Sequence, residues 1–83
     1  MYRVYNNQPY ECYRETEITF DTYREAMLFI YINYYYVKTE NLWLENKTIC
    51  DMIKENKFKL EDAEKAMEED NERFFEYYDF ECL

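Results

Sequence analysis

The chain contains no glycine among its 83 residues. Several ligand-binding loops require a residue without a Cβ atom at a fixed position, because their backbone adopts positive φ or approaches the ligand closely. Phosphate-binding P-loops, dinucleotide-binding Rossmann turns and calcium-binding EF-hand loops belong to this group. The sequence therefore excludes these sites for nucleotides and calcium.

Histidine and serine are also missing. Their absence excludes Ser-His-Asp and Cys-His catalytic arrangements and metal sites built on histidine. Carboxylates remain, but acid–base catalysis needs a concave site that separates their pKa values. Residues 68–72, four acids and an asparagine, would point around a helix instead of converging on a metal. We therefore predict a protein that is not an enzyme and holds neither a cofactor nor a metal.

Acidic residues gather in the last quarter of the chain. Residues 61–83 contain ten carboxylates and only two bases, Lys65 and Arg73, which gives this segment a net charge of −8. Residues 1–60 contain nine acids and eight bases, so nearly all of the formal net charge of −9 lies in one segment. This charge favours cationic partners and disfavours direct binding to nucleic acid or to an anionic membrane. A basic cluster at residues 54–59 is too small to outweigh the repulsion.

The length predicts one small domain over residues 1–83, and 48% hydrophobic and 22% aromatic residues are more than disordered segments contain. Three widely spaced cysteines, Cys12, Cys50 and Cys82, form no disulfide or metal-binding pattern, which favours a reducing compartment. The N-terminus lacks the apolar core of a signal peptide, and the longest apolar run, residues 26–37, is too short to span a bilayer. Asn, Lys, Ile, Tyr and Glu, whose codons are rich in A and T, dominate the composition, which indicates a genome of low GC content. A short, acidic, glycine-free chain from such a genome is a common form for an accessory protein of a phage or mobile element, so we expect a cytoplasmic protein of a bacterial host cell with this origin.

The spacing of apolar residues predicts an α+β fold. Residues 1–6 and 10–20 alternate with a period of two, which predicts an antiparallel hairpin with a turn at residues 6–9, open to extension by a third short strand. Thr22 and Glu25 match a capping box, which places a helix start there. An apolar stripe follows, made up of Tyr23, Ala26, Met27, Ile30, Tyr34 and Val37. We expect this helix to form the core on which the hairpin packs.

Two further helices are expected after a connector at residues 38–47. Thr48 suits the N-cap of a short helix that runs through Asn56. Its inward-facing residues would be Ile49, Met52 and Ile53. Leu60, Ala63, Met67, Phe74 and Tyr77 or Tyr78 form the stripe of a final helix over residues 60–78. The expected architecture is a short N-terminal antiparallel hairpin packed on about three helices, of which the last is strongly acidic.

An unbroken final helix would present a line of negative charge. At 1.5 Å per residue it would span about 30 Å, with about one carboxylate per 3 Å, close to the phosphate spacing along one B-DNA strand. The candidate phosphate surrogates are Glu64, Glu68, Glu69, Asp70, Glu72, Glu76 and Asp79. The alternative is a solvated helical face, supported by i,i+4 pairs of Glu61 with Lys65 and Glu69 with Arg73. Several like-charged i,i+4 pairs cost stability, so stability alone does not explain the pattern.

Eleven tyrosines and one tryptophan supply a second class of candidates. Tyrosine and tryptophan are enriched at interfaces, because they offer a large rigid contact area with a polar tip. Tyrosines at helical spacing more often belong to a half-buried core. The aromatic partner-binding candidates are Tyr35, Tyr36, Trp43, Tyr77 and Tyr78.

In size, acidity and inferred origin the chain resembles the phage-encoded anti-CRISPR and anti-restriction inhibitors that bind bacterial nucleases by imitating nucleic acid. This resemblance is one of composition and carries over no motif and no residue. It implies a stoichiometric inhibitor whose C-terminal helix occupies a basic channel of a nucleic-acid-binding defence enzyme. The alternative is a structural or assembly adaptor, with a homodimer as one form, that contacts its partner through the tyrosine and tryptophan surface.

Overall fold

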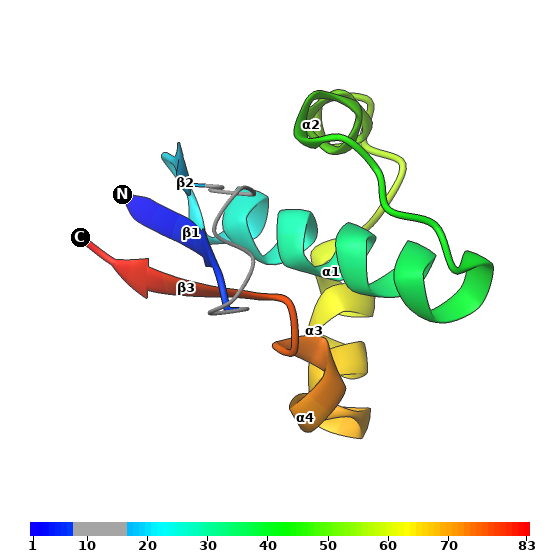
Figure 1. The fold of residues 1–83 in the computed structure, drawn as a ribbon. Helices are drawn as coiled ribbons and strands as arrows, with labels where there is room; N and C mark the ends of the chain where they lie inside the picture. Colours follow the sequence, from blue (N-terminus) through cyan, green and yellow to red (C-terminus); the bar gives the residue numbers. More distant parts are fainter. Residues whose placement is uncertain (8–16) are drawn as a thin grey trace.

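The computed structural model describes residues 1–7 and 17–83, which form an α+β fold, as predicted. Its elements run in the order β1 (Tyr2–Asn6), β2 (Glu17–Phe20), α1 (Tyr23–Glu40), α2 (Asn46–Lys54), α3 (Leu60–Glu69), α4 (Asn71–Phe74) and β3 (Tyr78–Cys82). The strands form one sheet, α1 extends away from one face of it, and the other helices lie around α1 (Figure 1). The predicted turn at residues 6–9 and the first part of the predicted second strand fall largely outside the described residues.

The sheet has the order β2-β1-β3, and both neighbours are antiparallel to β1. Val4 lies opposite Ile18 and Phe80, and these three residues share the face that packs on α1. Side chains of a strand alternate between its two faces, so Arg3 and its neighbours Thr19 and Glu81 lie on the other face. The predicted pairing of the first two strands is confirmed, and the third strand comes from the C-terminus of the chain.

Helix α1 begins where the capping-box pattern placed it. The hydroxyl of Thr22 accepts a hydrogen bond from the Glu25 amide at 3.2 Å and donates one to the Glu25 carboxylate at 2.9 Å. The Glu25 carboxylate thus contacts the side chain of the N-cap residue, Thr22. These bonds satisfy an amide that has no partner within the helix, which explains why the helix starts at this residue.

Helix α1 is buried on more sides than its predicted stripe covers. The stripe residues are buried or half-buried, as predicted. Four further residues are also buried: Leu28, Phe29, Ile32 and Asn33. The sheet covers one side of α1, and α2, α3 and α4 pack on the others. A helix that is apolar on most sides is expected at the centre of a fold and not on its surface.

Asparagine occupies the turn positions at which other proteins often use glycine. Asn41 ends α1 with φ 50°, and Asn56 follows α2 with φ 57°. The amides of Asn41 and Leu42 both donate to the Tyr36 carbonyl, which closes the end of α1. Asparagine tolerates this left-handed backbone better than other residues with a Cβ atom. The chain thus reverses direction after two helices without a glycine.

The second helix starts earlier than predicted. It spans Asn46–Lys54, and its N-cap is Glu45, which makes no side-chain capping bond. The prediction that Thr48 caps this helix is therefore wrong, because Thr48 lies within it. Ile49 and Ile53 are buried as predicted, and Met52 is half-buried.

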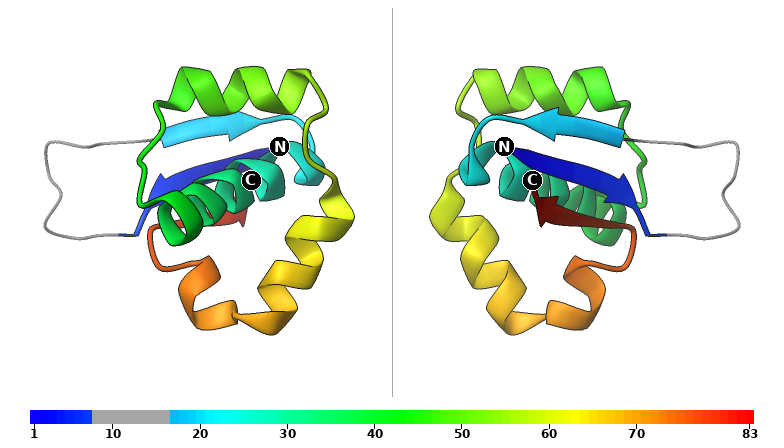
Figure 2. Two further views of the ribbon diagram at one scale, coloured as in Figure 1. Left: turned by 90° about the vertical axis from the view of Figure 1, so that its right-hand side faces the viewer. Right: turned by 90° about the vertical axis from the view of Figure 1, so that its left-hand side faces the viewer.

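The largest difference from the sequence prediction lies at the C-terminus. The predicted helix over residues 60–78 is wrong: α3 ends at Glu69, Asp70 leaves the helical region with φ −146° and ψ 60°, and the short helix α4 follows. Figure 2 shows α3 and α4 meeting at an angle. A continuous helix would place Glu68 and Glu72 one turn apart as like charges, which is unfavourable.

Residues 78–82 form a strand because their apolar residues recur at every second position and no longer at the helical spacing of three or four. Tyr78 and Phe80 face the core, whereas Asp79 and Glu81 face away from it. This alternation of apolar and acidic residues has a period of two, which suits a strand with one buried face. The sheet also supplies backbone partners, since the Asn7 amide bonds the Tyr77 carbonyl at 2.8 Å.

We predict that the buried side chains of α1 contribute more to the free energy of unfolding than exposed apolar side chains do. Leu28→Ala removes a fully buried side chain and should lower the free energy of unfolding by about 2 to 5 kcal/mol. Leu42→Ala is the matched control, since Leu42 is 47% exposed, and should change it by about 0.5 kcal/mol or less. Urea denaturation followed by circular dichroism measures both. Equal effects would contradict the central role of α1.

The strand assignment at the C-terminus predicts a specific NMR contact. The bonds that flank β1 and β3 make Val4 and Phe80 a non-hydrogen-bonded pair, in which the two Cα atoms approach most closely. A strong Hα–Hα nuclear Overhauser effect should therefore join Val4 and Phe80. Helical contacts between residues three apart that continue without a break from Glu69 to Tyr78 would instead restore the single-helix prediction.

Candidate functional site

Six exposed carboxylates lie along α3 and in the first turn of α4, and we call this group the acidic corner. Its members are Glu61, Asp62, Glu64, Glu68, Glu69 and Glu72. The apolar side of α3, with Ala63 buried and Met67 half-buried, packs toward α1, which leaves the acids facing solvent. At 1.5 Å per residue, α3 is about 15 Å long, half the length of the predicted charged helix.

None of the acidic-corner carboxylates pairs with a cation of the described residues. The acids that form ion pairs within the described residues are Glu81, Asp70 and Glu55, none of which belongs to the corner. The predicted i,i+4 pairs of Glu61 with Lys65 and Glu69 with Arg73 do not form, and the break at Asp70 removes the helical spacing that the second pair needs. The corner therefore presents negative charge that its own helices do not neutralise.

The remaining predicted phosphate surrogates have other environments. Asp70 is half-buried and accepts a hydrogen bond from the Tyr34 hydroxyl at 3.2 Å. Asp79 lies on β3, where its carboxylate accepts the Phe80 amide at 2.7 Å. Glu76 lies in the connection from α4 to β3 and lines a cleft. The predicted continuous row of charge is therefore wrong, because its members lie on two helices, a connection and a strand.

The structure separates the aromatic candidates. Tyr78 is 3% exposed, with its ring 5.5 Å from that of Phe29, so the structure places this predicted partner-binding residue in the core. Trp43 is 40% exposed and contacts the Tyr77 ring edge-to-face, with 4.6 Å between centroids. Tyr35 is 36% exposed. Tyr36 is half-buried and lies against Tyr35 and Phe58.

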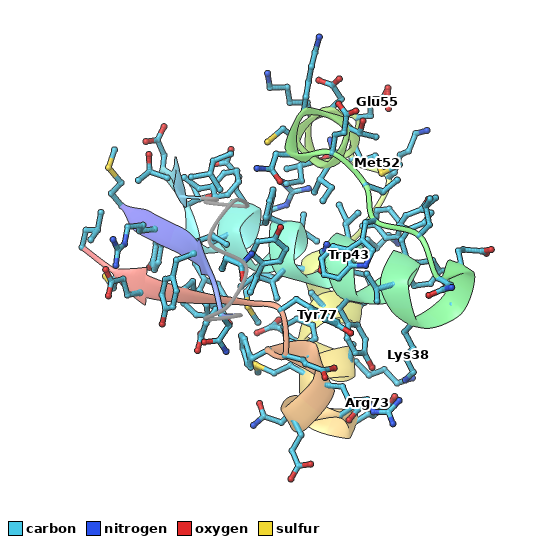
Figure 3. All side chains as sticks on the ribbon, viewed as in Figure 1. Lys38, Trp43, Met52, Glu55, Arg73 and Tyr77 are labelled. Carbon is cyan, nitrogen blue, oxygen red and sulfur yellow. The ribbon has the colours of Figure 1, made fainter. Side chains whose placement is uncertain are left out.

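A cleft of about 250 Å³ lies between the C-terminal end of α1 and the chain that follows α4. Its lining residues are Tyr34, Val37, Lys38, Asn41, Arg73, Glu76 and Tyr77. Figure 3 shows Lys38 extending from α1 toward the helix that carries Arg73, with Tyr77 and Trp43 beside each other nearby. The sequence prediction missed this cleft, because Lys38 and Arg73 are far apart in the sequence and no local pattern joins them.

A hydrogen-bonded group at the cleft connects α1 to the break between α3 and α4. The Lys38 ammonium donates to the Tyr34 hydroxyl at 2.9 Å and lies 3.7 Å from the Asp70 carboxylate. The bond to Tyr34, together with the negative charge of Asp70, raises the pKa of Lys38. Lys38 is therefore positively charged at neutral pH.

Cys50 lies half-buried on α2. Burial raises the pKa of the Cys50 thiol, which lowers its reactivity. Within residues 1–7 and 17–83, no cluster of three or more potential ligands is arranged to hold a metal ion. No helix in the same residues is long and apolar enough to cross a membrane.

No protein-family model, curated protein or solved structure matches the chain.

We predict that the Tyr34 hydroxyl contributes to stability through Asp70 and Lys38. Tyr34→Phe should lower the free energy of unfolding by about 0.5 to 1.5 kcal/mol. Tyr35→Phe is the matched control, because the Tyr35 side chain makes only ring contacts in the described residues, and should change it by less than about 0.5 kcal/mol. Thermal or urea denaturation distinguishes them. A Tyr34→Phe variant as stable as its control would contradict the role of the bond.

Proposed function

We propose that this protein is a non-catalytic inhibitor that docks its acidic corner on the basic surface of a nucleic-acid-binding enzyme in the cytoplasm of a bacterial host. Restriction nucleases and CRISPR effectors are the expected targets. The observation that carries the proposal is that six exposed carboxylates have no cationic partner among the described residues. A partner rich in lysine and arginine would supply the missing cations.

The chemistry of the acidic corner supports a partner that ordinarily binds nucleic acid. Arginine binds carboxylate and phosphate groups through the same two-pronged geometry, so a cleft built for phosphates also accepts carboxylates. Glu61, Glu64 and Glu68 are three and four residues apart on α3, which places them along one face of the helix. This face is short, and we therefore propose that it competes for a few phosphate positions and does not fill a long channel.

Packing of the corner supports a rigid docking surface. Ala63 is buried and Phe74 is 1% exposed, which anchors both α3 and α4 to the core. The stacking of Phe74 on Tyr31 and its contact with Tyr34 attach α4 to α1. Carboxylates on anchored helices lose less conformational entropy on binding than carboxylates on a flexible tail. This difference favours specific docking over general charge attraction.

We predict that inhibition of the target enzyme depends on the negative charge of the acidic corner. We would measure cleavage of duplex DNA by purified restriction and CRISPR nucleases at increasing concentrations of this protein. The test variant combines Glu64→Gln, Glu68→Gln and Glu72→Gln. Its inhibition constant should rise by about tenfold or more, because each exposed ion pair contributes up to about 1 kcal/mol. Wild-type inhibition should also weaken as salt or competing DNA increases.

The matched control carries the same change in charge on other elements. Glu40→Gln, Glu45→Gln and Asp51→Asn alter three exposed acids outside the acidic corner. This control should inhibit as well as the wild type. Equal loss in both variants would mean that net charge, and not the corner, drives binding. Inhibition that is retained in both variants would remove the corner from the mechanism.

A second candidate function is an assembly adaptor that binds a protein through aromatic surface, with homodimerisation as one form. Leu42 and Trp43 are 47% and 40% exposed, and the Trp43 ring contacts that of Tyr77. An interface of this kind depends little on salt, whereas an acidic one weakens steeply. Binding that resists high salt and is lost on Trp43→Ala would favour the adaptor over the inhibitor.

A further inference from the structure

The cleft between α1 and α4 has a different chemistry from the acidic corner. Lys38 and Arg73, two of the ten basic residues of the chain, line it together. Glu76 is the acid in the lining, and Asp70 reaches Lys38. The Arg73 guanidinium makes no ion pair with the described residues, so it remains available for an anion. A chain of net charge −9 thus brings two cations together in one hollow.

Aromatic rings form the apolar part of the same cleft. Tyr77 lines it, and Trp43 supports the Tyr77 ring through an edge-to-face contact at 4.6 Å. Tyr34 lines it from α1, and its ring lies 5.4 Å from that of Phe74. These contacts hold two of the lining rings in place. A flat apolar group would find a preformed surface beside the two cations.

We infer that this cleft binds an aromatic monocarboxylate, with its ring against Tyr77 and its carboxylate at Arg73 and Lys38. Asp70 already offsets the charge of Lys38, so Arg73, which makes no ion pair with the described residues, is the cation left for a carboxylate, and the Lys38 ammonium adds a hydrogen-bond donor. This arrangement favours a ligand with a single negative charge. Multiply charged phosphates and nucleic acid are disfavoured by Glu76 and by the acidic corner on the neighbouring helix. A volume of about 250 Å³ suits a small ligand or one terminal residue of a peptide. The inference is independent of the proposed inhibition.

Phenylacetate is a suitable probe, and the experiment uses the full chain labelled with ¹⁵N. Amide shifts should change saturably around Lys38 and around Arg73 to Tyr77, with a dissociation constant of about 1 mM for so small a ligand. The single tryptophan lies against Tyr77, so its fluorescence should change with the same constant. Phenethylamine carries the same ring with a positive charge and should cause no saturable change.

Two variants distinguish binding of phenylacetate in the cleft from nonspecific attraction of its carboxylate to any cation of the protein. Arg73→Gln removes a lining cation that pairs with no described residue, and it should weaken phenylacetate binding by about fivefold or more. Lys65→Gln removes an exposed cation outside the cleft and should leave binding unchanged. Unfolding curves confirm that both variants fold. Equal weakening in both, or equal binding of phenethylamine, would overturn the inference, as would the absence of saturable shifts.

The source of the carboxylate is tested by a second probe. A short peptide with a C-terminal phenylalanine presents the same chemistry as phenylacetate, and its amidated form lacks the charge. Tighter binding of the free-acid peptide would identify a protein C-terminus as the source, and tighter binding of phenylacetate a small molecule. Equal binding of the amidated peptide would overturn the role of the cations. The variant with three acidic-corner substitutions should retain phenylacetate binding, so the two proposals can fail separately.

Discussion

The burial of α1 is the interaction on which the rest of the structure depends. The sheet covers one side of this helix, and α2, α3 and α4 pack on the others. Residues 26–30 are all buried, a run too long for a helix with only one apolar face. A small domain buries a modest fraction of its surface, so one central helix that contacts every layer makes efficient use of few apolar residues. The acidic corner and the cleft both keep their shape because their helices are anchored to α1.

The ends of the helices determine how the surface elements are placed around this core. Asn41 adopts left-handed backbone and turns the chain from α1 toward Trp43. This turn allows Trp43 to reach Tyr77, which comes from the other end of the sequence. Asn56 does the same after α2, where its side chain accepts a hydrogen bond from Arg24 at 2.6 Å. The absence of glycine thus directs the turns to asparagine, whose own side chain can add a contact.

The break at Asp70 produces two surfaces of different chemistry. It ends α3, so the acids of that helix face solvent at the corner, and it redirects α4 so that Arg73 lines the cleft. A continuous helix would instead have placed Arg73 one turn from Glu69 as an i,i+4 pair. The hydrogen bond from Tyr34 to Asp70 joins the break to α1. One residue outside the helical region therefore separates a surface suited to basic partners from a cleft suited to an anion.

The sequence by itself determined the features that depend on neighbouring residues. The cap at Thr22, the inward side of α1, the first strand and the absence of glycine-dependent and histidine-dependent sites follow from local chemistry. Only the tertiary structure decided the features that need distant residues. The segment from Tyr78 to Cys82 becomes a strand because β1 offers it backbone partners, and Tyr78 is buried because α1 lies beneath it. Lys38 and Arg73 likewise line one cleft only because α1 and α4 pack together. Helical periodicity extends over a few turns and carries no information about which distant segments pack side by side.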